Sequence, residues 1–173
     1  MNFPKITTRW MNDDDVTAVE SIEKASNNYS WSFDTIKSVR NEDGVIPILA
    51  IHYTRIVGFL FMHLSNDVIS VVNMATHPDY RRMGVASMLI SKVKQKINSN
   101  RSLIVAETRE TQTPAQLFFR KEGFYATEIL RRHFQDELLD VECPPALICE
   151  DGYHFQYGNQ SLVPQKLTLH CGT

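Results

Sequence analysis

One stretch of the sequence repeats apolar residues at helical spacing, and it constrains the fold more than any other feature. The stripe consists of Val85, Leu89, Val93 and Ile97, with Ala86 and Ile90 alongside. The lysines of the same stretch fall mostly off the stripe, so one face of a helix starting near Arg82 can be buried. Such a face needs a second element to cover it, which predicts a layered fold.

Segments rich in β-branched and aromatic residues lie on both sides of this helix. The expected strands are 6–11, 45–52, 56–64, 68–76, 102–106, 124–134 and 146–157. The expected helices begin at Asn12 or Asp13, at Ser32, near Arg82 and at Pro114. Segment 102–106 is a continuous apolar run, which is typical of a strand buried on both faces. The order β, α, α, β, β, β, α, β, α, β, β predicts an α/β fold with a mixed sheet.

Composition excludes several classes of function. The 173 residues carry 18 Lys and Arg against 20 Asp and Glu, so no general attraction to nucleic acid or an acidic membrane is expected. The N-terminus lacks the apolar core of a signal peptide, and no apolar run approaches the length of about 18–20 residues that a spanning helix needs. Cys143, Cys149 and Cys171 form no CxxC pair and suggest reduced thiols in a cytoplasmic protein. The histidines have no metal-ligand spacing, so no metal is expected.

The loop between strand 68–76 and the long helix carries the pattern Arg81-x-x-Gly84-x-Ala86. Gly84 has no side chain, so a ligand can approach its backbone closely. The N–H groups at a helix N-terminus, together with the helix dipole, form a site suited to a pyrophosphate. The alternative interpretation is a basic turn that only caps an amphipathic helix.

Residues 73–89 resemble the acetyl-CoA-binding motif of the GNAT superfamily of N-acetyltransferases, which is [Q/R]xxGx[G/A]. Residues 56–59, reading IVGF, resemble the family's third strand. Residues 116–124, reading QLFFRKEGF, resemble its LYxxxGF helix and the strand that follows. The match covers residues 7–149 in family order. It implies a single α/β domain over 1–157, with a mainly antiparallel sheet of about seven strands and about four flanking helices, followed by a tail at 158–173.

Four features are similar to a subgroup, the bacterial ribosomal-protein-alanine N-acetyltransferases. They are Ser30-Trp31-Ser32, residues 77–82 (HPDYRR), Glu107-Thr108-Arg109 and residues 130–134 (LRRHF). This resemblance implies direct transfer of acetyl from acetyl-CoA to the α-amino group of a protein or peptide N-terminus. It leaves open two alternatives: a small-molecule amine as acceptor, or a module that binds acetyl-CoA but has lost efficient catalysis. The oligomeric state is also open.

The resemblance implies a set of acetyl-CoA-binding residues. They are Met74, Ala75, Thr76, Arg81, Arg82, Met83, Gly84, Val85, Ala86, Ser87, Gln112 and Phe119. Gln112 stands where the family usually has asparagine. Phe119 stands where the subgroup has tyrosine, the presumed acid that protonates CoA thiolate, and phenylalanine has no proton to give. An alternative interpretation of Phe119 is a core aromatic, with water or Tyr125 replacing the acid.

Glu107 is the expected general base. It follows strand 102–106 and precedes Phe118 by eleven residues, which matches the spacing of the family glutamate. The alternative is a strand-end carboxylate paired with Arg109 or a lysine. Trp31, His133 and Phe134 are the expected substrate-binding residues, with Trp31 alternatively a core aromatic. The substrate-facing hairpin is expected at 131–145.

Overall fold

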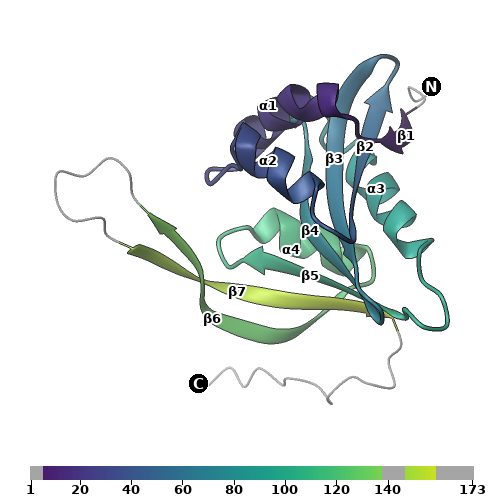
Figure 1. The fold of residues 1–173 in the computed structure, drawn as a ribbon. Coiled ribbons are helices and arrows are strands. Elements are labelled where there is room, and N and C mark those ends of the chain that lie inside the picture. Colours follow the sequence, from purple (N-terminus) through teal and green to yellow (C-terminus); the bar gives the residue numbers. More distant parts are fainter. Residues whose placement is uncertain (1–5, 138–146, 159–173) are drawn as a thin grey trace, which may run out of the picture. The chain divides into compact units, whose positions relative to one another are not determined.

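The computed structural model describes residues 6–137 and 147–158 of the chain (Figure 1). Packing divides the chain into two compact units, residues 1–104 and residues 105–173. Several predicted features fall outside the described residues. They are nearly all of the expected tail at 158–173, Cys143, Cys171 and the end of the expected hairpin at 131–145. The predicted boundary between domain and tail therefore stays a prediction.

The first unit contains four strands and three α-helices among its described residues. The strands are β1 (Ile6–Trp10), β2 (Val45–His52), β3 (Arg55–Leu64) and β4 (Val68–Thr76), in the order β1-β2-β3-β4. The helices are α1 (Val16–Ser26), α2 (Phe33–Arg40) and α3 (Val85–Lys94), with single 3-10 turns η1 (Asp13–Asp15) and η2 (Pro78–Tyr80). Each neighbouring pair of these strands is antiparallel, as the short turns between β2, β3 and β4 require.

Helices cover both faces of this part of the sheet, with α1 and α2 on one face and α3 on the other (Figure 1). Successive residues of β3 point to opposite faces. Phe59 and Phe61 therefore pack with the buried apolar residues of α1 and α2, whereas Gly58 lies against Val85 and Leu89 of α3. A Cβ on Gly58 would lie 2.8 Å from Val85 Cγ1, so the helix approaches the strand more closely than a side chain would allow.

Helix α3 is shorter than its apolar stripe predicts. It begins at Val85 rather than near Arg82, because Arg82 (φ 63°) and Gly84 (φ 82°) both take the left-handed conformation, which a helix cannot include. It ends at Lys94, and Ile97 lies in the turns that follow, where its N–H donates to Lys94 C=O. The stripe of Val85, Leu89 and Val93 is buried as expected.

Polar contacts fix the starts of α1 and α2. Ser32 caps α2 as predicted, because its Oγ accepts a hydrogen bond of 3.1 Å from Thr35 N–H. At the start of α1 the half-exposed Arg9 of β1 holds the buried carboxylate of Asp15 with two bonds, of 2.6 and 2.7 Å. Asp15 also accepts from the Asn12 N–H at 2.8 Å. These contacts tie the edge strand β1 to the start of α1.

The second unit contains β5 (Leu103–Arg109, whose first two residues belong to the first unit), α4 (Thr113–Lys121), β6 (Tyr125–Glu137) and β7 (Leu147–Gly158). The strand order is β5-β7-β6, and β6 and β7 form an antiparallel pair. Three aromatic rings form its core: Phe119 of α4 stacks on Phe155 of β7 at 5.8 Å and meets Phe124 edge-on at 5.1 Å.

Two expectations for β5 were wrong in detail. Strand β5 continues to Arg109, so Glu107 lies within it rather than after its end. Its burial alternates instead of extending to both faces, because Glu107 is a charged residue on the face opposite Ala106 and Thr108.

Among residues 6–137 and 147–158, no helix has the length and apolar character needed to cross a membrane.

Replacing Arg9 by glutamine is expected to lower the free energy of unfolding at neutral pH. The hydrogen bonds from Arg9 lower the pKa of Asp15, outweighing burial, which acts to raise it. A carboxyl whose pKa is depressed by folding contributes stability above its ordinary pKa of about 3.9, and that contribution is lost as pH falls through the depressed value. Urea unfolding at several pH values measures this.

The difference in free energy of unfolding between the parent and Arg9→Gln should be largest at neutral pH and should shrink toward acid pH. Lys24→Gln is the matched control, because it breaks an exposed pair with Glu20 four residues away. Its effect should be smaller at every pH. A difference between parent and Arg9→Gln that does not change with pH would contradict this account.

Candidate functional site

Glu107 presents an accessible carboxylate on β5. Alternate residues of this strand, Ile104, Ala106 and Thr108, are buried, each 3% exposed or less. Glu107 points to the opposite face, and its side chain is 40% exposed. The buried residues fix the strand, while the carboxylate remains open to a ligand or to water.

Two histidines from different strands hold this carboxylate. His133 Nε2 of β6 lies 2.6 Å from Glu107 Oε2, and His154 Nδ1 of β7 lies 3.4 Å from Oε1. A carboxylate only accepts hydrogen bonds, so each imidazole meets it with an N–H. The structure thus brings together Glu107 and His133, both predicted site residues, and adds His154, which sequence reasoning missed.

A second carboxylate, Glu150 of β7, fixes the chain that follows Glu107. It is 8% exposed, and it accepts from the backbone N–H and the hydroxyl of Thr111 and from Arg109 Nη1 at 3.3 Å. Burial acts to raise the pKa of Glu150, but the bonds from Thr111 and Arg109 outweigh it and leave that pKa lowered. The ionised side chain therefore anchors the loop that leads to Gln112, at the start of α4.

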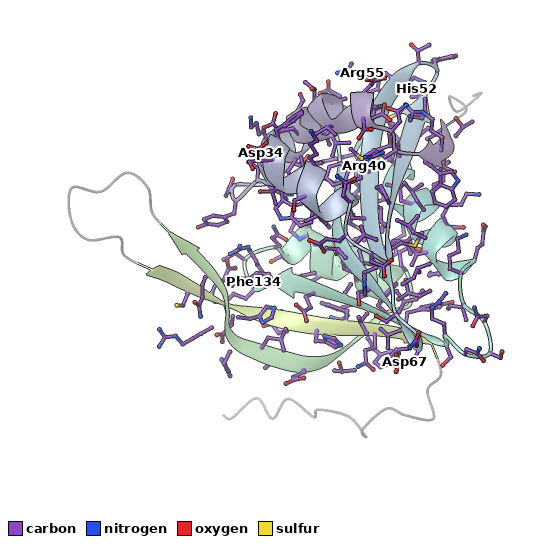
Figure 2. All side chains as sticks on the ribbon, in the orientation of Figure 1. Asp34, Arg40, His52, Arg55, Asp67 and Phe134 are labelled. Carbon is purple, nitrogen blue, oxygen red and sulfur yellow. The ribbon has the colours of Figure 1, made fainter. Side chains whose placement is uncertain are left out.

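Phe134 lies beside Glu107 and its histidines. The Arg109 guanidinium sits 4.5 Å from the centre of the Phe134 ring, and the His133 ring meets the same ring edge-on at 4.9 Å. Figure 2 labels Phe134 beside the paired strands β6 and β7. The ring packs over Gly152 of β7, which has no side chain: a Cβ there would lie 2.7 Å from Phe134 Cε2.

The predicted phosphate-binding residues lie in the first unit, where β4 leads into α3. Gly84 takes a left-handed conformation (φ 82°), and nothing lies within 4 Å of the place where its Cβ would be. Its carbonyl accepts the first bond of the helix from Met88 N–H. The N–H groups that precede that bond lie at the N-terminal, positive end of the helix. With the exposed Arg81 and Arg82, this helix N-terminus has the chemistry to bind an anionic group.

Contacts within the first unit hold this loop in place. His77 N–H donates to Val57 C=O at 2.9 Å, and Tyr80 N–H donates to His77 C=O at 2.9 Å. The Tyr80 ring packs against the His52 ring at 5.4 Å and under the Arg55 guanidinium at 5.7 Å. Figure 2 labels His52 and Arg55 at the turn between β2 and β3. The basic loop is therefore preorganised.

The end of β4 has unused hydrogen-bonding capacity. Thr76 Oγ1 is buried and has no hydrogen-bond partner among the described residues, and Thr76 C=O accepts from Ser26 Oγ at 3.2 Å. Ala75 is 8% exposed, and Met74 is partly buried. An apolar strand end with a spare hydroxyl, followed by an open glycine, fits an extended ligand that ends in phosphates.

The structure favours the core interpretation for two predicted residues. The Trp31 ring is partly buried against the first unit's apolar core, edge-on to Phe61 at 5.8 Å. Phe119 is 4% exposed, inside the aromatic core of the second unit. Their predicted ligand contacts remain predictions.

Sequence reasoning missed the buried Glu23 of α1. Its carboxylate accepts from Asn27 Nδ2 at 2.8 Å, Asn73 Nδ2 at 3.1 Å and Trp31 N–H at 3.3 Å. The sequence carries a signal for this residue, because Glu23 places a carboxylate on the apolar stripe of its helix.

The missed His154 also had a signal in the sequence. Phe155 is an apolar residue of a predicted strand, and strand alternation sends its neighbour His154 to the opposite face. No group of three or more potential metal ligands is placed to hold an ion in the part of the chain that the structure describes.

Comparisons with solved structures agree with this architecture. The ribosomal-protein-S18-alanine N-acetyltransferase of Escherichia coli matches with a TM-score of 0.72 and 18% identity, over 96% of this chain and 99% of that one. NAA60 of Arabidopsis thaliana, solved with a bisubstrate analogue, matches with a TM-score of 0.73 and 16% identity, over 89% of this chain and 98% of that one. Ard1 of Thermoplasma volcanium matches with a TM-score of 0.72 and 21% identity, over 88% of this chain and 97% of that one. The chain shares their fold, which confirms the predicted α/β class: the described residues form seven strands, mainly antiparallel, and four α-helices.

A search of curated proteins found no match. The family model described as the acetyltransferase (GNAT) family matches residues 8–124, which is more than half of the chain. The match includes the β4–α3 loop, Glu107 and the start of α4. The chain therefore belongs to the acetyltransferase (GNAT) family.

Proposed function

We propose that this protein transfers an acetyl group from acetyl-CoA to the α-amino group of a protein or peptide N-terminus. One observation carries the proposal: Glu107 is an accessible carboxylate with both oxygens held by imidazoles. The acceptor class is supported by a fold neighbour named for the alanine of a ribosomal protein, and the cofactor by a fold neighbour solved with acetyl-CoA.

The chemistry requires a base for the amine. An α-ammonium group has a pKa of about 7.7–8.0 and must lose a proton before its nitrogen can attack, whereas a lysine side chain, at about 10.4, demands more. Glu107 is the group that accepts this proton, directly or through one water. The Glu107 carboxylate, which accepts hydrogen bonds from two imidazoles, is suited to the α-ammonium group, because that group loses its proton more easily than a lysine side chain does.

Atoms and charges balance in a direct transfer. The amine nitrogen bonds to the acetyl carbon, the carbon–sulfur bond breaks, and CoA leaves as the thiolate. Glu107 takes the first proton, from the ammonium group. The nitrogen loses a second proton as it becomes an amide nitrogen, and solvent carries that proton to the thiolate, since Phe119 has no proton to give. A thiol pKa of about 8.5 makes the thiolate a tolerable leaving group.

Acetyl-CoA, when bound, supplies the thioester. We assign its pyrophosphate to the N-terminus of α3, from Arg81 to Ser87. We assign its pantetheine arm to Met74, Ala75 and Thr76. A backbone N–H of that strand end would stabilise the developing oxyanion. The open space at Gly84 and the unpartnered Thr76 hydroxyl support these assignments.

Replacing Glu107 by glutamine is expected to reduce kcat by about 100-fold or more, the contribution typical of a general base. The assay measures CoA release with peptides that begin with Ala, Ser or Met, beside a panel of small amines. The dissociation constant of acetyl-CoA should change by less than about twofold, because the base does not hold the cofactor. The matched control is Glu110→Gln, which removes an exposed carboxylate three residues along the same unit.

Each result of this assay points to a different function. Peptide turnover that Glu107→Gln abolishes supports the proposal, whereas turnover of small amines alone moves the acceptor to that class. Tight acetyl-CoA binding without turnover of any acceptor would indicate a binding module, as Phe119 in place of a proton donor allows. A fully active Glu107→Gln would remove Glu107 as the base.

Replacing Gly84 by alanine is expected to weaken acetyl-CoA binding about tenfold, equivalent to about 1.4 kcal/mol. Gly84 sits at φ 82°, where a Cβ is strained and would project into the open space above the helix N-terminus. Isothermal titration calorimetry measures the affinity. The control is Gly123→Ala, which carries similar strain (φ 87°) at the end of α4. Equal loss of affinity in both variants would show that the effect is general destabilisation.

A further inference from the structure

We propose that a β-bulge formed by Arg131, Arg132 and His133, and held by Asp151, places the His133 imidazole so that it orients the Glu107 carboxylate, which itself accepts the proton. The proposal rests on the function proposed above and adds positioning residues to it. His133 and Asp151 do not take part in the chemistry themselves.

The bulge is visible in the pairing of β6 with β7. Leu130 pairs with Gly152 and Phe134 with Glu150, so the three residues between them on β6 face the single residue Asp151 on β7. Arg132 lies in the left-handed conformation at φ 50°, which is strained for a residue with a side chain. Bulges of this kind are known to re-aim a side chain next to a functional site.

Asp151 holds the bulge with both carboxylate oxygens. Oδ1 accepts from the backbone N–H of Arg132 at 2.8 Å, and Oδ2 pairs with Arg131 Nη1 at 2.5 Å. The bond from the Arg132 backbone, and then that from Arg131, lower the pKa of Asp151, so the side chain is ionised at neutral pH. Its own backbone carbonyl accepts from Glu110 N–H at 2.9 Å, which fixes β7 at this point. The strained turn is therefore held from the opposite strand.

Strand geometry explains why the bulge is needed. Glu107 and Arg109 lie two residues apart on β5, so they share a face. His133 reaches Glu107, and its neighbour Phe134 packs against Arg109. In a regular strand these two neighbours would point to opposite faces. The bulge brings both onto the face of Glu107.

The consequence is a carboxylate with one orientation. His133 bonds Oε2 and His154 bonds Oε1, so the plane of the carboxylate is set from two strands. Without these donors, a 40% exposed glutamate side chain would sample several rotamers. Misplacement of a reacting group by about 1 Å can cost about 100-fold in rate.

The first test compares two pairs of variants by steady-state kinetics. His133→Ala and Asp151→Ala should each lower kcat by about 10- to 100-fold, with little change in the KM for acetyl-CoA. His133→Gln keeps an N–H donor, and Asp151→Asn keeps an acceptor for Arg132 N–H. The variants His133→Gln and Asp151→Asn should therefore each keep kcat within about threefold of the parent value. Arg131→Ala should have a small effect, because its pair with Asp151 is 76% exposed on the arginine side.

A double variant tests whether Asp151 acts through His133. If it does, Asp151→Ala should add almost nothing to His133→Ala, because both remove the same support. Additive losses would mean that Asp151 contributes independently, which overturns the positioning role. Glu110→Gln again serves as the control for loss of an exposed carboxylate in this unit, and thermal unfolding shows whether each variant is folded.

An NMR measurement gives a readout that does not depend on activity. The imidazole nitrogen resonances of His133 should shift in Glu107→Gln and in Asp151→Ala, and should stay near the parent values in Asp151→Asn. Unchanged resonances in both of the first two variants would overturn the proposal, because His133 would then not contact Glu107 through the bulge.

The two measurements together separate the two proposals. If Glu107→Gln abolishes turnover but His133→Ala leaves kcat unchanged, the acetyltransferase proposal stands and the positioning role fails. If the NMR shifts appear but Glu107→Gln remains fully active, the bulge exists as a structural feature. In that case Glu107 is not the base, and both the assignment of the base and the positioning role fail.

Discussion

The alternation of side chains along each strand is the constraint on which the rest of this structure depends. On β3 it sends Phe59 and Phe61 to the core beneath α1 and α2, and leaves Gly58 to receive α3. On β5 it buries Ala106 and Thr108 and exposes Glu107. The polar chemistry of the second unit therefore lies on strands that are fixed by their opposite, buried face. A functional carboxylate placed this way is held by the sheet and not by a loop.

The departures from regular geometry are found beside the polar residues. Arg82 and Gly84 take left-handed conformations before α3, and Arg132 takes one in the bulge of β6. A left-handed residue with a side chain costs about 1–2 kcal/mol. Asp151 holds the bulge around Arg132, and the His77–Val57 hydrogen bond fixes the start of the loop that leads to Arg82. Strained residues that are held in place by contacts from other segments of the chain are typical of sites that need a precise geometry.

Local patterns predicted most elements of the fold. Strands 45–52 and 68–76 have the predicted bounds, because turn-forming residues such as Gly44 stand at their ends and their apolar runs are unambiguous. Ser32 was predicted as a cap from its own chemistry. The start of α3 was wrong, because the apolar stripe says nothing about the backbone angle of Arg82. The full length of β5 was missed because Glu107, Thr108 and Arg109 are polar and are held as strand by pairing with β7.

The site was predictable only where a motif marks it. The glycine of the β4–α3 loop and the position of Glu107 follow from spacing along the chain. His154 and Asp151 do not, because their contacts depend on the register between β6 and β7 and on a bulge that no local pattern encodes. Register is a property of two strands together, so a single segment carries little information about it.

In the acetyl transfer proposed above, the burial of Phe119 places the main demand on the proposed base, Glu107. Its ring lies between Phe124 and Phe155 and is 4% exposed, where a tyrosine hydroxyl would need a hydrogen-bond partner that these phenylalanines do not offer. A chain without that hydroxyl cannot use it to protonate a leaving thiolate. Departure of the thiolate is then left to its own modest basicity, and removal of the amine proton becomes the step that the protein can accelerate. Two histidines and a strand bulge directed at one carboxylate are consistent with that division of the chemistry.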